Sequence, residues 1–556
     1  RTTILPLPKG EGRGEGEAMG DNRGAQNRHA STPQTNLHFR GKSETSDGAT
    51  VLGPVTIFAS GALTIGLEVL CLIWFRQTRQ PSVYALAATL FAFIVGLGAG
   101  AAAAAMARRR GVAAERALTL ALWAAGILAL TYPFLFHALQ QWSISRPLPA
   151  DPMTDAVTVA LTSTMLLLPL LLAAGAVLPL AWELARRGDA SQGRAVGMLT
   201  SLNKLGAAAG AAAAPLLVLP ALGLSGAVVS AGAIYLLLAG FWRARCLGNA
   251  HRISVRLAAP LLAGALAVAA AWWLRPAPYI PAPGETVLAV DQGAGGIVAT
   301  MDDPHGSRHI VQDQFYVLNG TGKSLLSQQH ESWIPLTLAP DPRRVLFIGM
   351  ASGISANAAL DFPIARLDTA ELVPGVARAA HTHFSRWNER LFRDPRARLL
   401  SADGRRVVQA AAPQSWDVVI CDLLLPSSEG TSALYSRDFL QTAASRLTPE
   451  GLFCLWLPLY QHDETMAGIV IRTFLEVFPN AIALRGNFDP LQPTMALIGS
   501  RAPLNLSNEF LAQRLASEGA RRAASESPLF RSPANFRLLF QGDLAAVRED
   551  FADFPA

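Results

Sequence analysis

The stretch Val345-Leu346-Phe347-Ile348-Gly349-Met350-Ala351-Ser352-Gly353 decides the fold of the C-terminal half of this sequence. An apolar strand runs into a glycine turn, and the turn opens a helical segment. Glycine at such a turn lets the backbone approach a ligand closely. Strands and helices then alternate along the chain, which predicts a doubly wound parallel sheet with its ligand at the C-terminal ends of the first strands. The further strands are expected at Ala365–Ala370, Ala397–Ser401, Asp417–Cys421 and Leu452–Leu457.

Acidic residues close three of these strands. Glu371 ends the second strand about twenty residues after the glycine turn, where a carboxylate can accept both hydroxyls of a ribose. Asp403, followed by Gly404, ends the third strand, and Asp422 ends the fourth. Carboxylates at the same edge of one sheet indicate a site that binds a nucleoside and handles protons. Upstream, a small antiparallel sheet is expected from Thr286–Val290, Gly296–Thr300, His309–Val311 and Gln314–Leu318.

Residues 285–500 resemble the spermidine synthase (polyamine aminopropyltransferase) family, and the whole chain resembles its membrane-fused bacterial members, in which a transporter-like bundle comes first. The order and spacing of several segments together make the resemblance specific. They are Leu318-Asn319-Gly320, Gln329-His330-Glu331, Val345–Gly353, Glu371, Asp403-Gly404, Asp417–Asp422, Leu434–Phe439 and Leu447–Gly451. The resemblance implies a Rossmann-like domain behind a small N-terminal β-sheet. It also implies decarboxylated S-adenosylmethionine, or S-adenosylmethionine itself, as donor, an amine as acceptor, and no metal.

The resemblance also implies roles for individual residues. Glu371 would hold the ribose, Asp403 and Gly404 the adenine, and Asp422 would take a proton from the attacking amine. The remaining donor-side residues would be Gly349, Ala351, Ser352, Gly353, His330 and Glu331. The acceptor side would include Leu425, Tyr435 and Tyr460.

Three positions depart from the family pattern, and each loses a carboxylate. Ser352 stands where the family's glycine loop has an Asp that anchors the donor's amine, and Leu425 replaces the acidic residue that grips a diamine. Val373 replaces an acidic residue two positions after the ribose glutamate. These losses weaken the case for a free diamine. Two alternatives therefore stay open: another S-adenosylmethionine-dependent transfer, such as methyl transfer, to an apolar or lipid-borne acceptor, and a catalytically degenerate nucleoside-binding membrane protein.

The N-terminal half is apolar and basic. Of the 556 residues 51% are hydrophobic and 16% charged, and the net charge is +6. Residues 51–280 hold 16 Lys and Arg against 6 Asp and Glu, whereas residues 281–556 hold 24 against 29, which argues against a nucleic-acid surface. Six or seven membrane helices are predicted between 51 and 275. The apolar stretches are Gly53–Phe75, Val83–Ala107, Ala117–Phe136, Val157–Leu184, Ala195–Leu219, Leu224–Trp242 and Leu257–Leu274.

Arginines concentrate in alternate loops, which places the N-terminus in the cytoplasm. Since the expected donor is made there, we expect the synthase-like domain to be cytoplasmic beside the inner membrane, with Leu257–Leu274 re-entrant or interfacial. A pair between Glu68 and Lys204 is expected to join two spans, and the Gly/Ala-rich fifth span is expected to pack closely.

The other boundaries follow from composition. Residues 1–50 are expected to be disordered, with Met19 a candidate start, and 276–284 to form a Pro-rich linker. Residues 285–330 form the small sheet, 331–500 the Rossmann-like domain and 501–556 a helical tail. The expected partners are a small amine and the lipid membrane, with no nucleic acid; a homodimer stays open. The four cysteines form no metal or disulfide pattern.

Overall fold

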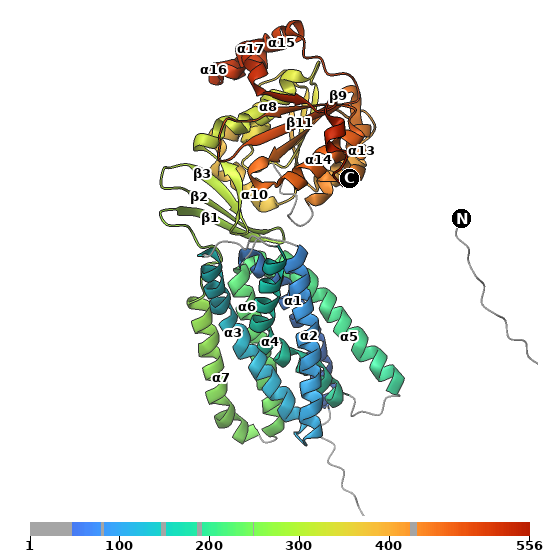
Figure 1. The fold of residues 1–556 in the computed structure, drawn as a ribbon. Helices are drawn as coiled ribbons and strands as arrows, with labels where there is room; N and C mark the ends of the chain where they lie inside the picture. Colours follow the sequence, from blue (N-terminus) through green and yellow to red (C-terminus); the bar gives the residue numbers. More distant parts are fainter. Residues whose placement is uncertain are drawn as a thin grey trace, which may run out of the picture. The chain divides into compact units, whose positions relative to one another are not determined.

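The computed structural model describes residues 47–78, 83–145, 152–185, 192–247, 250–422 and 431–555. The predicted disordered segment lies outside these ranges up to residue 46. Residues 49–556 form one compact unit that holds a helical bundle and an α/β domain (Figure 1). The helices of the bundle are α1 (Asp47–Thr78), α2 (Val83–Arg109), α3 (Ala114–Ile144), α4 (Pro152–Ala185), α5 (Gln192–Ala213), α6 (Leu219–Leu247) and α7 (Ala250–Trp273).

Five helical segments among the described residues are long and apolar enough to cross a membrane. One of them, Gly193–Arg245, has 53 residues and would be about 80 Å long at 1.5 Å per residue, far more than one crossing needs. It contains α5, a short π-helix at Ala214–Val218, and α6, and the chain turns at Gly223, whose φ of 71° is left-handed. This segment therefore makes two passes.

Contacts at the two ends of the bundle show which helix ends lie together. At one end Arg108 pairs with Glu183 at 2.6 Å, and the Trp242 indole donates to Thr56 Oγ1 at 2.9 Å. At the other end Ser143 donates to the carbonyl of Thr78, and Ser225 donates to that of Pro276.

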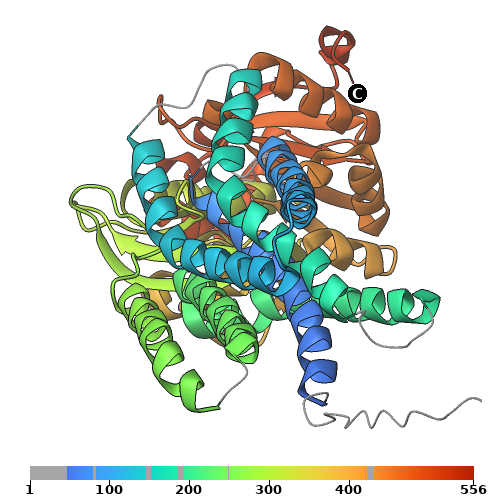
Figure 2. The ribbon, with the colours of Figure 1, turned by 90° about the horizontal axis from the view of Figure 1, so that it is seen from below.

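The last helix, α7, runs the length of the bundle (Figure 1) and packs against α6, beside which it lies in the view from below (Figure 2). The predicted segment Leu257–Leu274 therefore lies, up to Trp273, in a continuous helix along the bundle and not in the re-entrant or interfacial segment expected from the sequence. Its apolar run is shortened by the polar residues between 251 and 256, which is why the sequence left its course open. Among the described residues, the chain thus runs along the bundle seven times.

The fifth helix packs closely against the first, as predicted. A Cβ atom on Gly206 would lie 2.1 Å from the carbonyl oxygen of Phe58, and one on Gly210 equally close to that of Ala62. Residues further along α5 contact residues further along α1, so the two helices run parallel. The expected pair of Glu68 and Lys204 is not formed within the described residues, because Lys204 lies at the level of Gly61, about 10 Å along the helix from Glu68.

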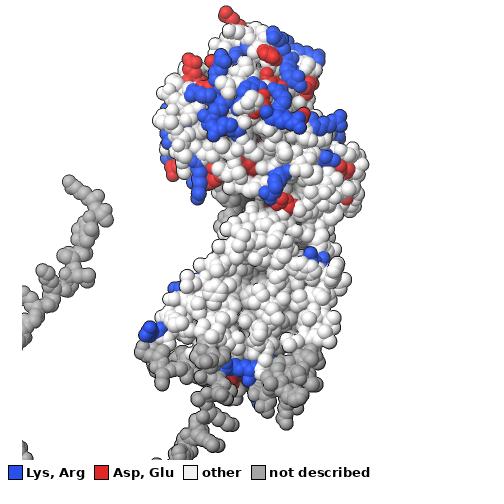
Figure 3. All heavy atoms as spheres, turned by 180° about the vertical axis from the view of Figure 1, so that it is seen from behind, with Lys and Arg blue, Asp and Glu red and all other residues white. Residues whose placement is uncertain are grey.

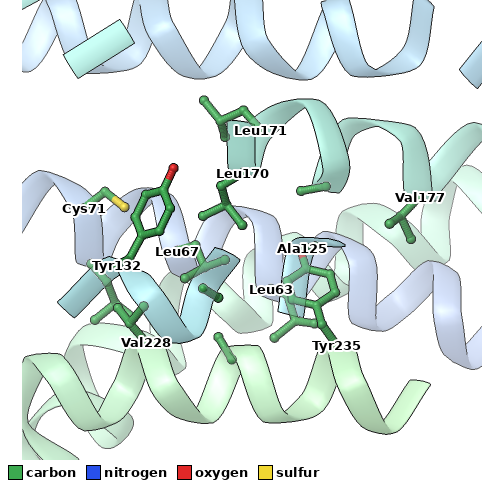
Figure 4. Close-up of a cluster of buried hydrophobic side chains, with 14 of the residues drawn as sticks. Leu63, Leu67, Cys71, Ala125, Tyr132, Leu170, Leu171, Val177, Val228 and Tyr235 are labelled. Atoms are coloured by element: carbon green, nitrogen blue, oxygen red, sulfur yellow. The ribbon is translucent and has the colours of Figure 1, made fainter. Parts of the chain in front are cut away.

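Apolar side chains fill the inside of the bundle and also cover its outside. Leu63, Leu67, Tyr132, Leu170 and Val228 pack together from four helices (Figure 4). Large apolar side chains point outward as well, and the bundle shows few charges on the face drawn in Figure 3. Examples of exposed residues are Phe91, Ile94, Leu120, Met165 and Leu217.

The α/β half contains two sheets. The small one is antiparallel, in the order β1 (Thr286–Gly293), β2 (Gly296–Asp302), β3 (Arg308–Gln312) and β4 (Tyr316–Gly320). The large one has the order β12-β10-β11-β9-β8-β5-β6-β7, in which β9, β8, β5, β6 and β7 are parallel. Its strands are β5 (Arg344–Ile348), β6 (Arg366–Glu371), β7 (Ala397–Ser401), β8 (Trp416–Cys421), β9 (Leu447–Pro458), β10 (Asn480–Arg485), β11 (Thr494–Ser500) and β12 (Phe540–Asp543).

Alternate residues of the large sheet enter two separate cores. Val345 and Phe347 pack under α8 (Leu325–Leu338), α9 (Ile354–Ala359), α10 (Pro374–His383) and α11 (Ser385–Arg393). Leu346 and Ile348 pack under α12 (Gly404–Ala410), α13 (Arg437–Arg446) and α14 (Glu464–Val477). Helices thus cover both faces, which confirms the predicted Rossmann-like domain with a small N-terminal sheet.

One expected boundary needs correction. Residues 501–556 are not only a helical tail of α15 (Asn508–Leu515), α16 (Glu518–Glu526) and α17 (Pro533–Phe536), because β12 joins the large sheet beside β10. The strand β12 has only four residues, one of them glycine, so its sequence is too short to show the alternation of apolar and polar residues that predicts a strand. The Pro-rich linker packs against the small sheet, since Tyr279 is buried and its hydroxyl contacts Met301 Sδ at 3.3 Å.

The small sheet is fastened to the bundle through Asp313. This side chain is buried and accepts hydrogen bonds from Gln77 Nε2 at 2.7 Å and from the amide of Ile297 at 2.9 Å. Arg76, at the end of α1, pairs with its other oxygen at 2.6 Å.

Candidate active site

The predicted acidic residues meet at one edge of the large sheet. Ile348 pairs with Ala370 on one side and with Cys421 on the other, and Glu371 pairs with Ser401. The strands β5, β6, β7 and β8 therefore end at the same level. This edge carries the glycine turn, Glu371, Asp403 and Asp422.

The glycine turn is held in a left-handed conformation. Gly349 has a φ of 87° and Gly353 a φ of 76°. Ala351, between them, has a φ of 48°, which is strained for a residue with a Cβ atom. Such strain is typical of a loop shaped by a ligand.

Glu371 holds this turn to the end of β6. Its carboxylate accepts the amide of Met350 at 3.1 Å and that of Val373 at 2.8 Å, and it is 8% exposed. Burial raises the pKa of Glu371, and the backbone hydrogen bonds oppose that rise. An acceptor in this position suits a ribose, whose two hydroxyls are donors.

Asp403 and Gly404 begin α12 beside the same edge. Asp403 caps the helix by accepting the amide of Arg405 at 2.9 Å. A Cβ atom on Gly404 would lie 2.5 Å from Ile348 Cγ2, so only glycine allows this helix to start so close to β5.

Ser352 is buried and does not offer a charge to a ligand. Its hydroxyl donates to Gln328 Oε1 at 2.7 Å, and its carbonyl accepts from Asn388 Nδ2, also at 2.7 Å. Sequence reasoning missed Gln328. Its signal is the three-residue spacing from Glu331, which places both side chains on one face of α8.

Glu331 meets the catalytic candidate Asp422. Both side chains are buried, at 2% and 5% exposure, and they are hydrogen-bonded to each other. Ser355, in the helix after the glycine turn, donates to the other side of the Glu331 carboxylate. Burial and the neighbouring charge of Asp422 raise the pKa of Glu331 well above its usual range.

The remaining predicted residues lie further from the edge of the sheet that carries the acidic residues, or outside the described residues. His330 turns away from the edge, with its ring nitrogens 3.0 Å from the carbonyl of Gly486 and from Ser527 Oγ, beside a separate groove of about 1060 Å³. Tyr435 is buried in the core that contains Ile348 and Cys421. Tyr460 follows β9 at an exposed position, and the burial of part of its ring raises the pKa of its hydroxyl. Leu425 lies outside the described residues.

The comparisons with known proteins agree with this geometry. Residues 330–480 match the family described as spermine/spermidine synthase domain. Polyamine aminopropyltransferase 2 of Streptomyces coelicolor is 28% identical over 414 residues, which cover 72% of each chain. Residues 330–480 are therefore similar in sequence to the spermidine synthase family.

The Streptomyces relative extends the similarity beyond the spermidine synthase domain. Residues 276–556 number only 281, so more than 100 of the matched residues must lie in the helical half. Putrescine N-methyltransferase 2 of Nicotiana tabacum is also similar, 28% identical over 167 residues, which are 29% of this chain and 45% of that protein. Among solved structures, spermidine synthase from Thermotoga maritima matches 48% of this chain and 87% of its own, with 19% identity and a TM-score of 0.40. The family match and the Streptomyces relative, and not this structural likeness, indicate a transferase.

Proposed function

We propose that this protein transfers an aminopropyl group from decarboxylated S-adenosylmethionine to a small amine. The observation that carries the proposal is the buried carboxylate Asp422 at the end of β8, beside the edge formed by the glycine turn, Glu371 and Asp403. The family match and the aminopropyltransferase relative support the same reaction.

The chemistry needs one base and good alignment. An alkylammonium is not a nucleophile until it loses a proton, and Asp422 can bind the cation and then accept that proton. The amine nitrogen attacks the aminopropyl carbon next to sulfur, the carbon–sulfur bond breaks, and sulfur keeps the electron pair as neutral methylthioadenosine. Because the leaving group is neutral, the residues around the adenosine mainly need to hold the donor in line.

A second candidate reaction is methyl transfer from intact S-adenosylmethionine. The neutral hydrogen-bonded pair of Ser352 and Gln328 occupies the position where the family's glycine loop has an aspartate. Neutral dipoles suit the zwitterionic amino-acid end of S-adenosylmethionine better than the lone cation of its decarboxylated form. The similarity to a putrescine N-methyltransferase supports this candidate.

The two reactions leave different nucleosides. The purified full chain in detergent would be given each donor with putrescine or with a monoamine, and the products identified by mass spectrometry. Aminopropyl transfer gives methylthioadenosine from the decarboxylated donor, whereas methyl transfer gives S-adenosylhomocysteine from the intact one. Asp422→Asn should abolish most turnover, and Asp550→Asn, at an exposed carboxylate, is the control. S-adenosylhomocysteine as the single product would establish the second candidate instead.

We also propose that the bundle lies in a lipid bilayer. Outward-facing apolar side chains and segments of sufficient length support this placement. The distribution of arginines bears on which side of the membrane the α/β domain occupies. Arginines are frequent where α2 meets α3, α4 meets α5 and α6 meets α7, and they are sparse at the end of the bundle that leads to the α/β domain. Seven passes and the positive-inside rule favour the face opposite those loops for the synthase domain. Donor supply favours the cytoplasm, so a reporter fusion is the deciding experiment.

A further inference from the structure

Glu331 is the most deeply buried carboxyl group at the sheet edge. It projects from α8 between Ser355 of the glycine-turn helix and Asp422 of β8. The helix is fixed at this point, because the Trp456 indole of β9 donates to the Glu331 carbonyl at 3.1 Å. A carboxyl group costs several kcal/mol to bury as an isolated ion, so its presence here requires an explanation.

The hydrogen bond between Glu331 and Asp422 explains why a carboxyl group can be buried here. Two ionised carboxylates are acceptors only and repel each other, so they can be hydrogen-bonded only when one carries a proton. The proton belongs on Glu331, because it is the more deeply buried of the two and Asp422 ends a strand beside the donor edge. Burial and the charge of Asp422 raise the pKa of Glu331 in agreement with this assignment.

We infer that Glu331 is a positioning residue that holds one proton against Asp422, so that the two carboxyl groups present a single negative charge to the acceptor. The inference rests on the proposed function of Asp422 as the base. One oxygen of Asp422 accepts the Glu331 proton, which leaves the other oxygen to face the amine in a fixed direction. A singly charged pair matches one alkylammonium, so the acceptor is recognised as a monocation at its reacting end.

The proton balance of the step follows from this arrangement. The ammonium gives one proton to the Asp422 carboxylate, and the pair becomes neutral with two protons. The free amine then forms the new carbon–nitrogen bond and becomes a secondary ammonium, while sulfur leaves with its electron pair. The proton on Asp422 returns to solvent after the products leave, and Glu331 keeps its own proton throughout.

The groups that face the pair do not replace Glu331 as a proton donor. Tyr460, Cys421 and Cys454 are the other titratable neighbours, and burial together with the pair's charge raises the pKa of each. They therefore stay protonated at neutral pH without adding charge. His330 faces Gly486 and Ser527 on the far side of α8.

Two substitutions distinguish a protonated Glu331 from an ionised one. Glu331→Gln keeps a neutral donor toward Asp422, so kcat should stay within a few-fold of wild type. Glu331→Leu removes the donor, so kcat should fall by roughly 10²-fold while the KM for the donor is unchanged. In the Leu variant Asp422 loses its hydrogen bond in an apolar setting, and the acidic limb of kcat/KM should move to higher pH. Equal loss in both variants, or no loss in the Leu variant, would overturn the inference.

A spectroscopic measurement keeps the test independent of turnover. Infrared difference spectra of the full chain should show the carbonyl band of a protonated carboxylic acid at neutral pH, and Glu331→Gln should remove it. Absence of turnover with this band present would remove the proposed reaction but leave the shared proton. Turnover with no such band would contradict the shared proton alone.

Discussion

Gly404→Ala tests how tightly the donor edge is built. Gly404 is the first residue of α12, where alanine would ordinarily favour the helix by up to about 1 kcal/mol over glycine. Because Gly404 lies against β5, we expect alanine to destabilise the protein here. The new Cβ atom would lie 2.5 Å from Ile348 Cγ2 and 3.3 Å from Cγ1, so either the helix start or the strand end must move.

The size of the effect follows from the contact. Ile348 is 3% exposed and cannot swing into solvent, and overpacking of this kind costs about 1–3 kcal/mol. The melting temperature of the domain should fall by roughly 2–12 °C, since each kcal/mol corresponds to about 2–4 °C in a domain of this size. Methylthioadenosine should also bind more weakly, because Asp403 moves with the start of α12.

Thermal unfolding in detergent and titration calorimetry measure the two effects. Gly542→Ala is the matched control, because a Cβ atom there meets nothing within 4 Å. Combining Gly404→Ala with Ile348→Ala should cost less than the two single changes added together, since the second change removes the clashing methyl group. A Gly404→Ala protein as stable as wild type, with unchanged nucleoside affinity, would refute this account of the edge.

Three further predictions concern the donor, pH and the membrane. Glu371→Gln should weaken methylthioadenosine binding by about 1–3 kcal/mol in calorimetry, with Glu450→Gln, at an exposed position of β9, as control; equal affinity would show that Glu371 does not hold the ribose. Burial lowers the pKa of His330 below its usual 6.5, so the domain should lose stability as pH falls through about 6.5; a His330→Gln denaturation profile as steep as wild type would contradict this. A reporter fused after Arg275 should be active in the cytoplasm, where the donor is made; activity only outside the cytoplasm would contradict the cytoplasmic placement and agree with the arginine distribution instead.

The sequence predicted the sheet and its edge because both depend on local patterns. The apolar strand before Gly349 and the acidic strand ends at Glu371 and Asp422 are all visible in short windows, and the strand register brings them together. The family resemblance rested on the same segments and is confirmed by the domain match.

Features that depend on packing between distant elements could not be predicted. The contact between Glu331 and Asp422 depends on how α8 is rotated against β9, where Trp456 fixes it. The left-handed Ala351 carries no sequence signal, because alanine gives no sign of a positive φ. The hydrogen bond between Ser352 and Gln328 likewise joins the glycine turn to α8, and the distance between them in the sequence does not indicate that they are in contact.

The course of α7 was left open for a different reason. Hydropathy measures only the apolar part of a helix, and the polar residues before Leu257 belong to the same helix in the structure. Its packing against α6 decides that it runs the length of the bundle.

The central claim is that Asp422 takes the proton from the acceptor amine. Its most direct test is the rate of product formation by Asp422→Asn, measured with decarboxylated S-adenosylmethionine and a saturating amine, together with methylthioadenosine affinity. The account predicts a rate lower by about 10²–10⁴-fold, with the fold and the nucleoside affinity retained, because asparagine cannot accept the proton. A variant that still turns over at close to the wild-type rate would contradict the claim.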